Sequence, residues 1–481
     1  MANKKLYLNG EWVDFPSHFT VRDPGKNEVI AEVAAADAAA ARKAVESARR
    51  AFAGWRALTA MERADYIHAV IRKIAERRDE IAETITRENG KPLAQSLGEV
   101  GMTIDHFRWF AEEARRAYGR VIPNQAPGKR HLVLRQPIGV VAAIAPWNFP
   151  LVLAVRKVAP ALAAGCTVIL RPASQTPLSA LLLAECFEAA KVPGGVFQVI
   201  AGPAEPIAQE FLANPDCRKI SFTGSTEVGR RLLEGSAATI TKLSLELGGH
   251  APVIVFEDAD MDLAVEGALV TKFRNTGQSC IAANRIYVQS SIYEHFLERF
   301  VARAKEMKVG YGLEPGVDIG PLVNEAGLKT ALSHVQNAVQ SGARLMCGGK
   351  ALERKDGHYL EPTVLADVPE TAACMREETF APIAPVCRFE TVDEAIRQAN
   401  NTPYGLAAYA YTSDLGRAWY LAESLEAGTI GINDSVPSTS NAPFGGVKES
   451  GQGRELGSEG LDAFLETKHI SFGGISKPYG A

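Results

Sequence analysis

One cysteine in this sequence lies where a nucleophile could reach a substrate. Cys280 ends the segment Phe273–Cys280, a glycine-containing loop that comes just before a predicted strand. In such a loop a substrate can approach the thiol, and the backbone N–H of the same residue can point into the same space. The pattern also fits a buried, inert thiol, which is the commoner state of an intracellular cysteine.

Two other residues could assist attack on a carbonyl carbon. Glu246 follows an apolar stretch and precedes two glycines, and a carboxylate in apolar surroundings has a raised pKa that suits a general base. Asn148 lies in the rigid turn Pro146–Pro150, where its side-chain amide could donate to an oxyanion. Each also has a plainer interpretation, as a solvated or helix-capping glutamate and as an ordinary turn residue.

A third segment could bind phosphate. Phe222–Gly229 follows a predicted strand and opens a helix, so backbone amides near Gly224 and Ser225 could receive an anion. The usual dinucleotide fingerprint Gly-x-Gly-x-x-Gly is missing from this segment, and the spacing alone is a weak indication of a nucleotide cofactor. The sequence has no His-x-x-x-His or Cys-x-x-Cys spacing, and we expect no metal site.

Taken together, these motifs resemble the aldehyde dehydrogenase superfamily. The resemblance rests on six segments in the family's order: Pro146–Pro150, Phe222–Gly229, Glu246–Gly249, Gly277–Cys280, Glu377–Pro382 and Pro443–Gly446. It implies an α/β fold with an atypical Rossmann NAD(P)-binding domain, an α/β catalytic domain and a small β oligomerisation arm. The expected bounds are 1–118 and 138–247 for the NAD(P)-binding domain, 248–459 for the catalytic domain, and 119–137 with 460–481 for the arm.

The resemblance implies a covalent route for oxidising an aldehyde. The Cys280 thiolate would attack the aldehyde carbon, while the Asn148 amide and the Cys280 backbone N–H hold the oxyanion. Hydride transfer to NAD or NADP would leave a thioester on the cysteine. Water activated by Glu246 would then hydrolyse that thioester, without help from a metal.

The resemblance also implies how the cofactor is held. Four residues would contact its pyrophosphate and its nicotinamide riboside: Ser225 and Trp147 for the first, Glu378 and Phe380 for the second. At the adenosine end, family members often carry Lys-Pro-x-Glu, whereas this sequence has Arg171 and Ser174 at the outer positions. A serine there removes the repulsion of a 2′-phosphate, and an arginine can bind it, so NADP is expected, with NAD use left open. The arginine could equally be a neutral replacement.

Two further arginines predict an anionic substrate. Arg274 lies six residues before the nucleophile, and Arg156 follows the oxyanion asparagine by eight. This pair is similar to that of the succinate-semialdehyde dehydrogenase group, where the matching arginines bind the distal carboxylate, and Ser438 and Ser440 would lie near it. Succinate semialdehyde is the leading substrate, with sulfolactaldehyde and the semialdehydes of glutarate and 2-oxoglutarate as alternatives. Each arginine could instead form a structural ion pair.

The elements that must position these residues form two α/β sets after a helix-rich start. Helices are predicted over Ala34–Trp55 and Met61–Asn89. The first set has strands Ile138–Ile144, Thr167–Leu170, Val196–Ile200 and Lys219–Phe222, with helices Ala154–Ala164, Ser179–Ala190 and Ala204–Ala213. The second has strands Pro252–Phe256, Arg285–Val288, Ala343–Met346, Pro385–Phe389 and Thr429–Asn433, with helices Leu263–Lys272, Ile292–Ala304 and Val392–Ala399. Strand and helix alternating at this spacing favours parallel, doubly wound sheets.

Composition narrows the class of protein. The 481 residues are ordinary globular composition and enough for two or three domains. The net charge of −4 gives no basic surface for nucleic acid or for an anionic membrane. The uncharged stretch Gln136–Val155 is interrupted by Pro146, Asn148 and Pro150, so it is interpreted as a buried strand entering a loop.

The seven cysteines and the N-terminus predict where in the cell the protein lies. An odd number of widely spaced cysteines, with no secretory signal, indicates reduced thiols in the cytoplasm. The arm-like segments lead us to expect a homodimer or homotetramer.

Two other functions compete with aldehyde oxidation. One is a thiol esterase or acyl transferase that uses no nicotinamide, and the other is a non-catalytic member of the fold.

Overall fold

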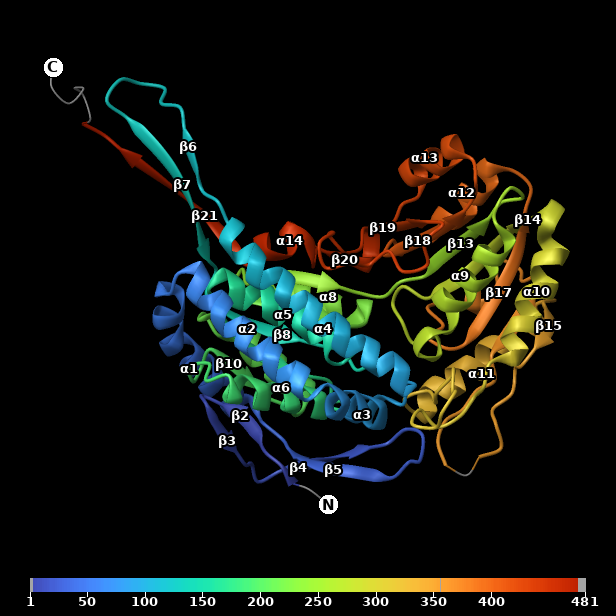
Figure 1. Ribbon diagram of the computed structural model, residues 1–481, viewed down its shortest axis with the longest axis horizontal. Coiled ribbons are helices and arrows are strands. Elements are labelled where there is room, and N and C mark those ends of the chain that lie inside the picture. The colour runs from blue at the N-terminus through green and yellow to red at the C-terminus, as the bar shows by residue number, and fades with distance from the viewer. Residues whose placement is uncertain (1–2, 355, 475–481) are drawn as a thin grey trace.

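The computed structural model describes residues 3–354 and 356–474, which form two α/β lobes and a projecting β arm (Figure 1). Strands of the described chain pair into one sheet of eight strands, one of seven and two of three.

The first lobe is built on the eight-stranded sheet. Its order is β20-β12-β11-β8-β9-β10-β2-β3, and the five strands from β12 to β10 are mutually parallel. Strands β8 and β9 are buried at every residue, as expected where helices cover both faces. The bounds are β2 (Leu6–Leu8), β3 (Glu11–Val13), β8 (Val140–Ile144), β9 (Thr167–Arg171), β10 (Phe197–Val199), β11 (Cys217–Thr223), β12 (Lys242–Glu246) and β20 (Gly451–Gln452).

Eight helices accompany this sheet. A Thr59–Glu62 capping box starts the second of them, and Asp37 caps the first. Their bounds are α1 (Ala38–Ala57), α2 (Ala60–Glu76), α3 (Arg78–Asn89), α4 (Leu93–Glu113), α5 (Val152–Ala164), α6 (Leu178–Ala189), α7 (Ala204–Ala213) and α8 (Thr226–Ser236). Every residue of α5 is buried. This helix therefore provides a fixed base for the loop before it, which carries Asn148.

The second lobe carries the seven-stranded sheet, with order β15-β16-β17-β14-β13-β18-β19. All neighbours are parallel except β15, which runs antiparallel to β16. The strands are β13 (Ala251–Val255), β14 (Ala283–Gln289), β15 (Arg344–Cys347), β16 (Thr363–Ala366), β17 (Ile383–Phe389), β18 (Ala407–Tyr411) and β19 (Thr429–Ile432). The helices are α9 (Met261–Phe273), α10 (Tyr293–Glu306), α11 (Glu325–Gln340), α12 (Val392–Asn400) and α13 (Leu415–Ser424).

The arm is an antiparallel sheet of order β21-β7-β6 that extends away from both lobes (Figure 1). It consists of β6 (Arg120–Ile122), β7 (Arg130–Pro137) and β21 (Leu465–Phe472), and the short helix α14 (Gly457–Asp462) precedes the last strand. The remaining small sheet, β1-β5-β4, is made by β1 (Asn3–Lys4), β4 (His18–Arg22) and β5 (Val29–Ala34). Residues 475–481, which we expected in the arm, lie outside the described residues.

The strand–helix alternation expected from the sequence is confirmed, with two corrections. The helix-rich start is wrong for residues 3–34, where five short strands occur instead. The helix expected over Met61–Asn89 is two helices, because the chain leaves helical geometry at Arg77. The expected catalytic range 248–459 also contains β20, which pairs with β12 in the first lobe's sheet.

Within residues 3–354 and 356–474, no helix is both long and apolar enough to cross a bilayer. The same residues contain no group of three or more His, Cys, Asp or Glu side chains placed to hold a metal ion.

Candidate active site

The loop that carries Cys280 is held in an unusual backbone conformation. Between α9 and β14, Asn275, Thr276 and Gly277 all have positive φ angles of 50°, 59° and 73°. Such conformations cost energy for non-glycine residues and persist where surrounding contacts fix them. Here the Asn275 N–H donates to Gln95 Oε1 at 2.8 Å, and the Thr276 hydroxyl donates to a backbone carbonyl at 3.1 Å. The loop is therefore rigid before any substrate arrives.

A glycine lets the two lobes approach each other at the nucleophile. A Cβ atom added at Gly249 would lie 2.1 Å from the Cys280 carbonyl oxygen, so no larger residue fits without moving that backbone. Gly249 connects β12, which ends at Glu246, to β13 in the second lobe. The close contact explains why the segment with the carboxylate and the segment with the thiol come together.

Asn148 is fixed beside the same loop. It is buried, and its side-chain Nδ2 donates to the Gln278 carbonyl at 3.1 Å. An amide nitrogen carries two hydrogens, so one remains to donate toward a substrate oxygen. The structure thus brings Asn148 to the Cys280 loop, and its role at an oxyanion stays a prediction.

Glu246 ends β12 in a buried position, and its Oε2 has no hydrogen-bond partner among the described residues. Burial raises the pKa of Glu246 well above its ordinary value, and the nearby Glu455 carboxylate raises it further. The direction agrees with the sequence-based expectation. A carboxylate with a raised pKa and a vacant oxygen is suited to take a proton from water.

Two charged residues near Glu246 were missed by sequence reasoning. Lys157 on α5 donates from Nζ to Glu455 Oε1 and to Thr223 Oγ1, both at 2.6 Å. The lysine charge lowers the pKa of Glu246 while Glu455 raises it. The two partners are 298 residues apart in the chain, and nothing local in the sequence indicates that they pair.

The surroundings of the Cys280 thiol favour its protonated form. The residue keeps partial exposure, yet loss of water around its sulfur raises the pKa of the thiol to about 12. The carboxylates of Glu378 and Glu246 raise that pKa too, whereas the positive charge of Arg156 lowers it. Attack therefore requires that the thiol lose its proton to a base or gain further positive charge nearby.

Two guanidinium groups lie close enough to affect this thiol, and neither has a carboxylate partner. Arg156 donates from Nη2 to Ser438 Oγ at 2.9 Å and lies over the Phe444 ring at 4.5 Å. Arg274 lies over the Phe149 ring at 5.1 Å. Within the described residues neither arginine forms an ion pair, so the alternative of structural ion pairs is wrong. Burial lowers the pKa of Arg274, and the charge of Arg156 lowers it further.

The two serines expected near these arginines differ in their contacts. The Ser438 hydroxyl accepts the Arg156 bond and keeps its own hydrogen for another acceptor. Ser440 is bonded through its backbone carbonyl, which accepts from the Gly457 N–H at 2.9 Å. Both residues are partly exposed.

A cavity of about 850 Å³ fits the adenosine end of a dinucleotide. Arg171, Ser174 and the start of α7 are among the residues that line it. Arg171 donates from Nη2 to the Gly202 carbonyl at 2.9 Å, while its buried Nε has no partner among the described residues. An orphaned guanidinium nitrogen beside a serine hydroxyl matches the needs of a phosphate group.

Three other residues that we expected to contact the cofactor lie in loops: Gly224 and Ser225 between β11 and α8, and Glu378 before β17. Ser225 caps α8, and its hydroxyl accepts from the Val228 N–H, while Gly224 precedes it at the end of β11. The Glu378 carboxylate accepts from the Gly249 N–H at 3.0 Å, and burial raises its pKa to about 7.

Two aromatic rings accompany these groups. Trp147 and Phe380 meet edge to face with centroids 5.5 Å apart, and both are partly exposed. Phe380 has a left-handed φ (49°), as do Asn275, Thr276 and Gly277 of the nucleophile loop.

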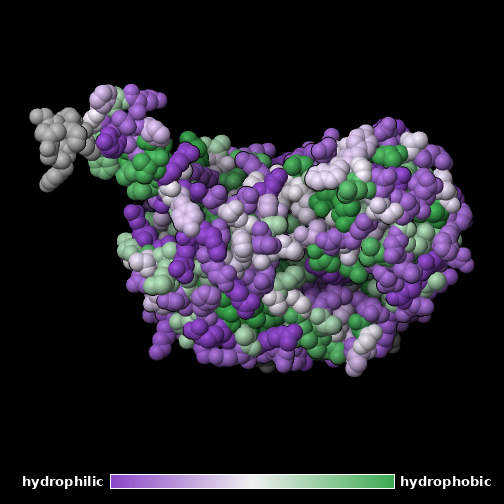
Figure 2. Space-filling model, turned by 45° about the horizontal axis from the view of Figure 1, so that its top comes forward, coloured by the Kyte–Doolittle hydropathy of each residue, from purple (hydrophilic) through white to green (hydrophobic). Residues whose placement is uncertain are grey.

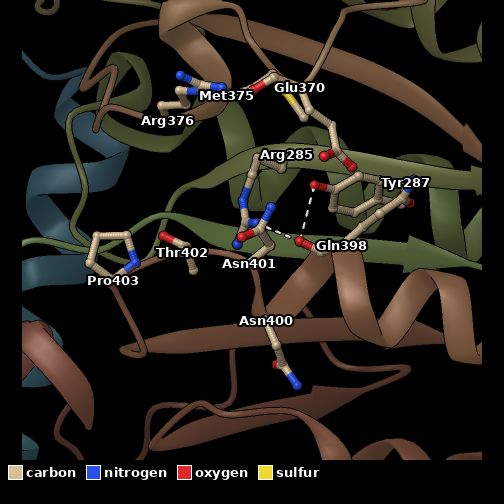
Figure 3. A pocket seen from close by; sticks show the side chains of 10 residues that line it. All are labelled: Arg285, Tyr287, Glu370, Met375, Arg376, Gln398, Asn400, Asn401, Thr402 and Pro403. Carbon is tan, nitrogen blue, oxygen red and sulfur yellow. Dashed lines mark hydrogen bonds between the residues drawn. The ribbon is translucent and has the colours of Figure 1, made fainter.

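A second cavity, of about 520 Å³, lies in the second lobe, and none of the site residues expected from the sequence lines it (Figure 3). Its central side chain, Arg285, is directed at the backbone carbonyls of Gln398, Ala399 and His250 and is satisfied by them. We assign this cavity no chemistry.

Comparisons with known proteins agree with this arrangement. The model of the family described as "Aldehyde dehydrogenase family" matches residues 12–470. A glutarate-semialdehyde dehydrogenase of Pseudomonas putida is 48% identical over 98% of both chains. The NADP(+) succinate-semialdehyde dehydrogenase GabD of Escherichia coli is 48% identical over 98% of both chains. A 3-sulfolactaldehyde dehydrogenase of Pseudomonas putida is 46% identical over 99% of this chain and 98% of its own.

The fold agrees as well. A crystal structure of an E. coli NADP-dependent enzyme superposes with a TM-score of 0.97 at 48% identity, over 98% of both chains. At this similarity the arrangement of the two lobes and the arm is shared.

The charges around Glu246 predict how the reaction rate depends on pH. The carboxylate is the form that accepts a proton, so kcat should fall as the pH drops through its raised pKa. Glu455→Gln removes a negative neighbour but leaves the lysine, and should move this acidic limb to lower pH. Steady-state rates of aldehyde oxidation between pH 5 and 9 would measure the shift. A limb that stays in place or moves to higher pH would contradict the assignment.

Proposed function

The chain belongs to the aldehyde dehydrogenase family, and we propose that it oxidises an aldehyde with an anionic tail, succinate semialdehyde before others, to the corresponding acid. NAD or NADP serves as the electron acceptor. The observation that carries the proposal is the pair Arg156 and Arg274, whose guanidiniums lie near the Cys280 thiol without a carboxylate partner. Two such charges without a counter-ion are costly unless a ligand supplies one.

The residues of the chain divide the reaction among them. Cys280 Sγ, once deprotonated, forms a bond to the aldehyde carbon and gives a thiohemiacetal. The free hydrogen of Asn148 Nδ2 and the Cys280 N–H donate to the resulting oxyanion. A bound NAD or NADP would supply the hydride acceptor, and loss of hydride from the thiohemiacetal carbon would leave a thioester on Cys280. Glu246 then accepts a proton from the water that attacks the Cys280 thioester, and the acid leaves with the thiol restored.

The relatives support an anionic tail but differ in its chemistry. Their names give glutarate semialdehyde, succinate semialdehyde and 3-sulfolactaldehyde as substrates. Succinate semialdehyde leads because Arg156 and Arg274 correspond to the carboxylate-binding pair of that group. One observation favours a sulfonate as second candidate: the Ser438 hydroxyl beside Arg156 could donate to a third oxygen.

The rival functions have weaker support. A thiol esterase that needs no nicotinamide would leave the Arg171 and Ser174 cavity without a purpose. A non-catalytic member would have no need to retain the nucleophile, the asparagine and the buried carboxylate together. We also infer a cytoplasmic location, because all seven cysteines are free thiols.

The arginine pair is tested by removing one member. For Arg274→Ala we expect the KM for succinate semialdehyde to rise about 30-fold or more, because a buried charge partner of the carboxylate is lost. The KM for butanal, which has the same length and no charge, should change by less than about 3-fold. Steady-state NADPH formation measures both. Equal increases for the two aldehydes would remove the argument for an anionic tail.

The cofactor site is tested at Ser174. Ser174→Glu places a carboxylate in the Arg171 cavity, and its repulsion should raise the KM for NADP about 10-fold or more. The KM for NAD should change little, because NAD has no 2′-phosphate. Initial rates with each cofactor measure the effect. Equal changes for NAD and NADP would show that Ser174 does not face the 2′-position.

The arm provides the surface for self-association. Val121, Leu134 and Phe472 are exposed apolar residues on its strands, and Leu415 and Trp419 are exposed on α13 of the second lobe. Figure 2 shows hydrophobic surface both where the arm leaves the body and on the upper part of the opposite lobe. We infer a homodimer or homotetramer in which the arm covers apolar surface of a second copy.

Light scattering tests the assembly. The wild-type mass should be two or four times 51.7 kDa. Val121→Asp should lower that mass by placing a charge on the arm, whereas Met61→Asp, at an exposed position on α2, should not. A wild-type monomer, or an equal effect of both substitutions, would contradict the inference.

A further inference from the structure

A buried ion pair lies behind the loop that carries Asn148. Lys91 follows α3 and Glu99 belongs to α4, and both side chains are fully buried. Lys91 Nζ donates to Glu99 Oε2 at 2.7 Å. The function proposed above makes no use of either residue.

The lysine reaches the backbone of the oxyanion asparagine. Lys91 Nζ donates to the Asn148 carbonyl at 2.7 Å, and Asn275 Nδ2, from the nucleophile loop, donates to the same oxygen at 2.7 Å. Asn89 Nδ2 adds a bond at 3.0 Å to the carbonyl of Trp147. One charged and two amide donors therefore fix the peptide groups on which the Asn148 side chain depends.

The glutamate anchors the other end of the same segment. Glu99 Oε1 accepts from the N–H groups of Leu151 and Val152 at 2.9 and 3.1 Å, where α5 begins. A carboxylate is stabilised by the free N–H groups of a helix start. The pair thus spans the turn from Asn148 to the first residues of α5.

The Phe149 ring lies next to both Lys91 of the buried ion pair and Arg274. Lys91 Nζ lies 3.9 Å from the centroid of the Phe149 ring, and the Arg274 guanidinium lies 5.1 Å from it. Burial lowers the pKa of Lys91 and the nearby Arg274 charge lowers it further, while Glu99 opposes both effects. The Glu99 carboxylate therefore favours the charged form of the lysine.

We propose that Lys91 and Glu99 are positioning residues that hold the Asn148 amide at the distance the oxyanion requires. The inference rests on the proposed role of Asn148. A buried ion pair adds little stability compared with apolar side chains of the same volume, so its bonds to both ends of the turn 148–152 indicate a geometric purpose. A displacement of about 1 Å at such a position can reduce a rate about 100-fold.

A ratio of two reactions at Cys280 isolates this role. Attack on an activated aryl ester such as p-nitrophenyl acetate forms an oxyanion, whereas alkylation by iodoacetamide needs the thiolate and forms none. The ratio of the two second-order rate constants cancels any change in the thiolate fraction. Lys91→Met keeps the apolar stem but loses the charge, and should lower the ratio about 10- to 100-fold. The kcat for aldehyde oxidation should fall similarly, with the KM changed less than about 3-fold.

A double variant covers the case in which the single variant does not fold. Lys91→Met with Glu99→Gln leaves no unpaired buried charge, and its ratio should fall as well. Thermal melting and thiol titration establish which variants are folded. An unchanged ratio in a folded variant would overturn the proposal, and so would failure of both variants to fold, since the pair would then be a structural requirement.

Two controls separate this inference from others. Lys219→Met removes another buried lysine, which donates to Ser244 Oγ at 2.6 Å, and should leave the ratio unchanged. An equal fall there would contradict a specific role for Lys91. Asn148→Ala should lower the ratio at least as far as Lys91→Met. If Asn148→Ala does not, the proposed function itself is wrong, whereas a fall only in Asn148→Ala overturns the positioning role alone.

Discussion

The constraint on which the site depends is positive charge held near a desolvated thiol without a carboxylate to balance it. Arg156 and Arg274 come from different lobes, and the structure gives them a hydroxyl and aromatic faces instead of a counter-ion. Leaving such groups unpaired is unfavourable, and folds rarely do so without a ligand to complete them. The buried helix α5 and the strained nucleophile loop keep the two guanidiniums where they are.

Two buried lysines near the site, unlike these two arginines, are paired with carboxylates. Lys157 binds Glu455, and Lys91 binds Glu99, so these residues tune or position their neighbours without needing a ligand. Arg171 resembles Arg156 and Arg274, because its buried Nε has no hydrogen-bond partner among the described residues and the side chain lines a cavity that fits a phosphate. Arg156, Arg274 and Arg171 thus lack a carboxylate where we propose that anions bind, whereas Lys157 and Lys91 are paired beside the groups that we propose react.

Sequence reasoning found the residues whose surroundings are local. Cys280, Glu246 and Asn148 each lie in a short motif of glycines, prolines or apolar residues, and the alternating strands and helices follow from periodicity. It missed the Lys157–Glu455 and Lys91–Glu99 pairs because a buried, paired charge has the same local sequence pattern as a solvated one. It also missed β18, whose alanines have low strand propensity, and the strands before α1, which are too short to show a period.

The central claim is that the site is built for an aldehyde with an anionic tail. It is tested most directly by the kcat/KM values of the wild-type protein for succinate semialdehyde, sulfolactaldehyde and butanal, each with NADP and with NAD. We predict that one of the anionic aldehydes exceeds butanal by about 100-fold or more, which corresponds to about 3 kcal/mol of charge-assisted binding. Equal values for butanal would contradict the claim and make Arg156 and Arg274 structural residues.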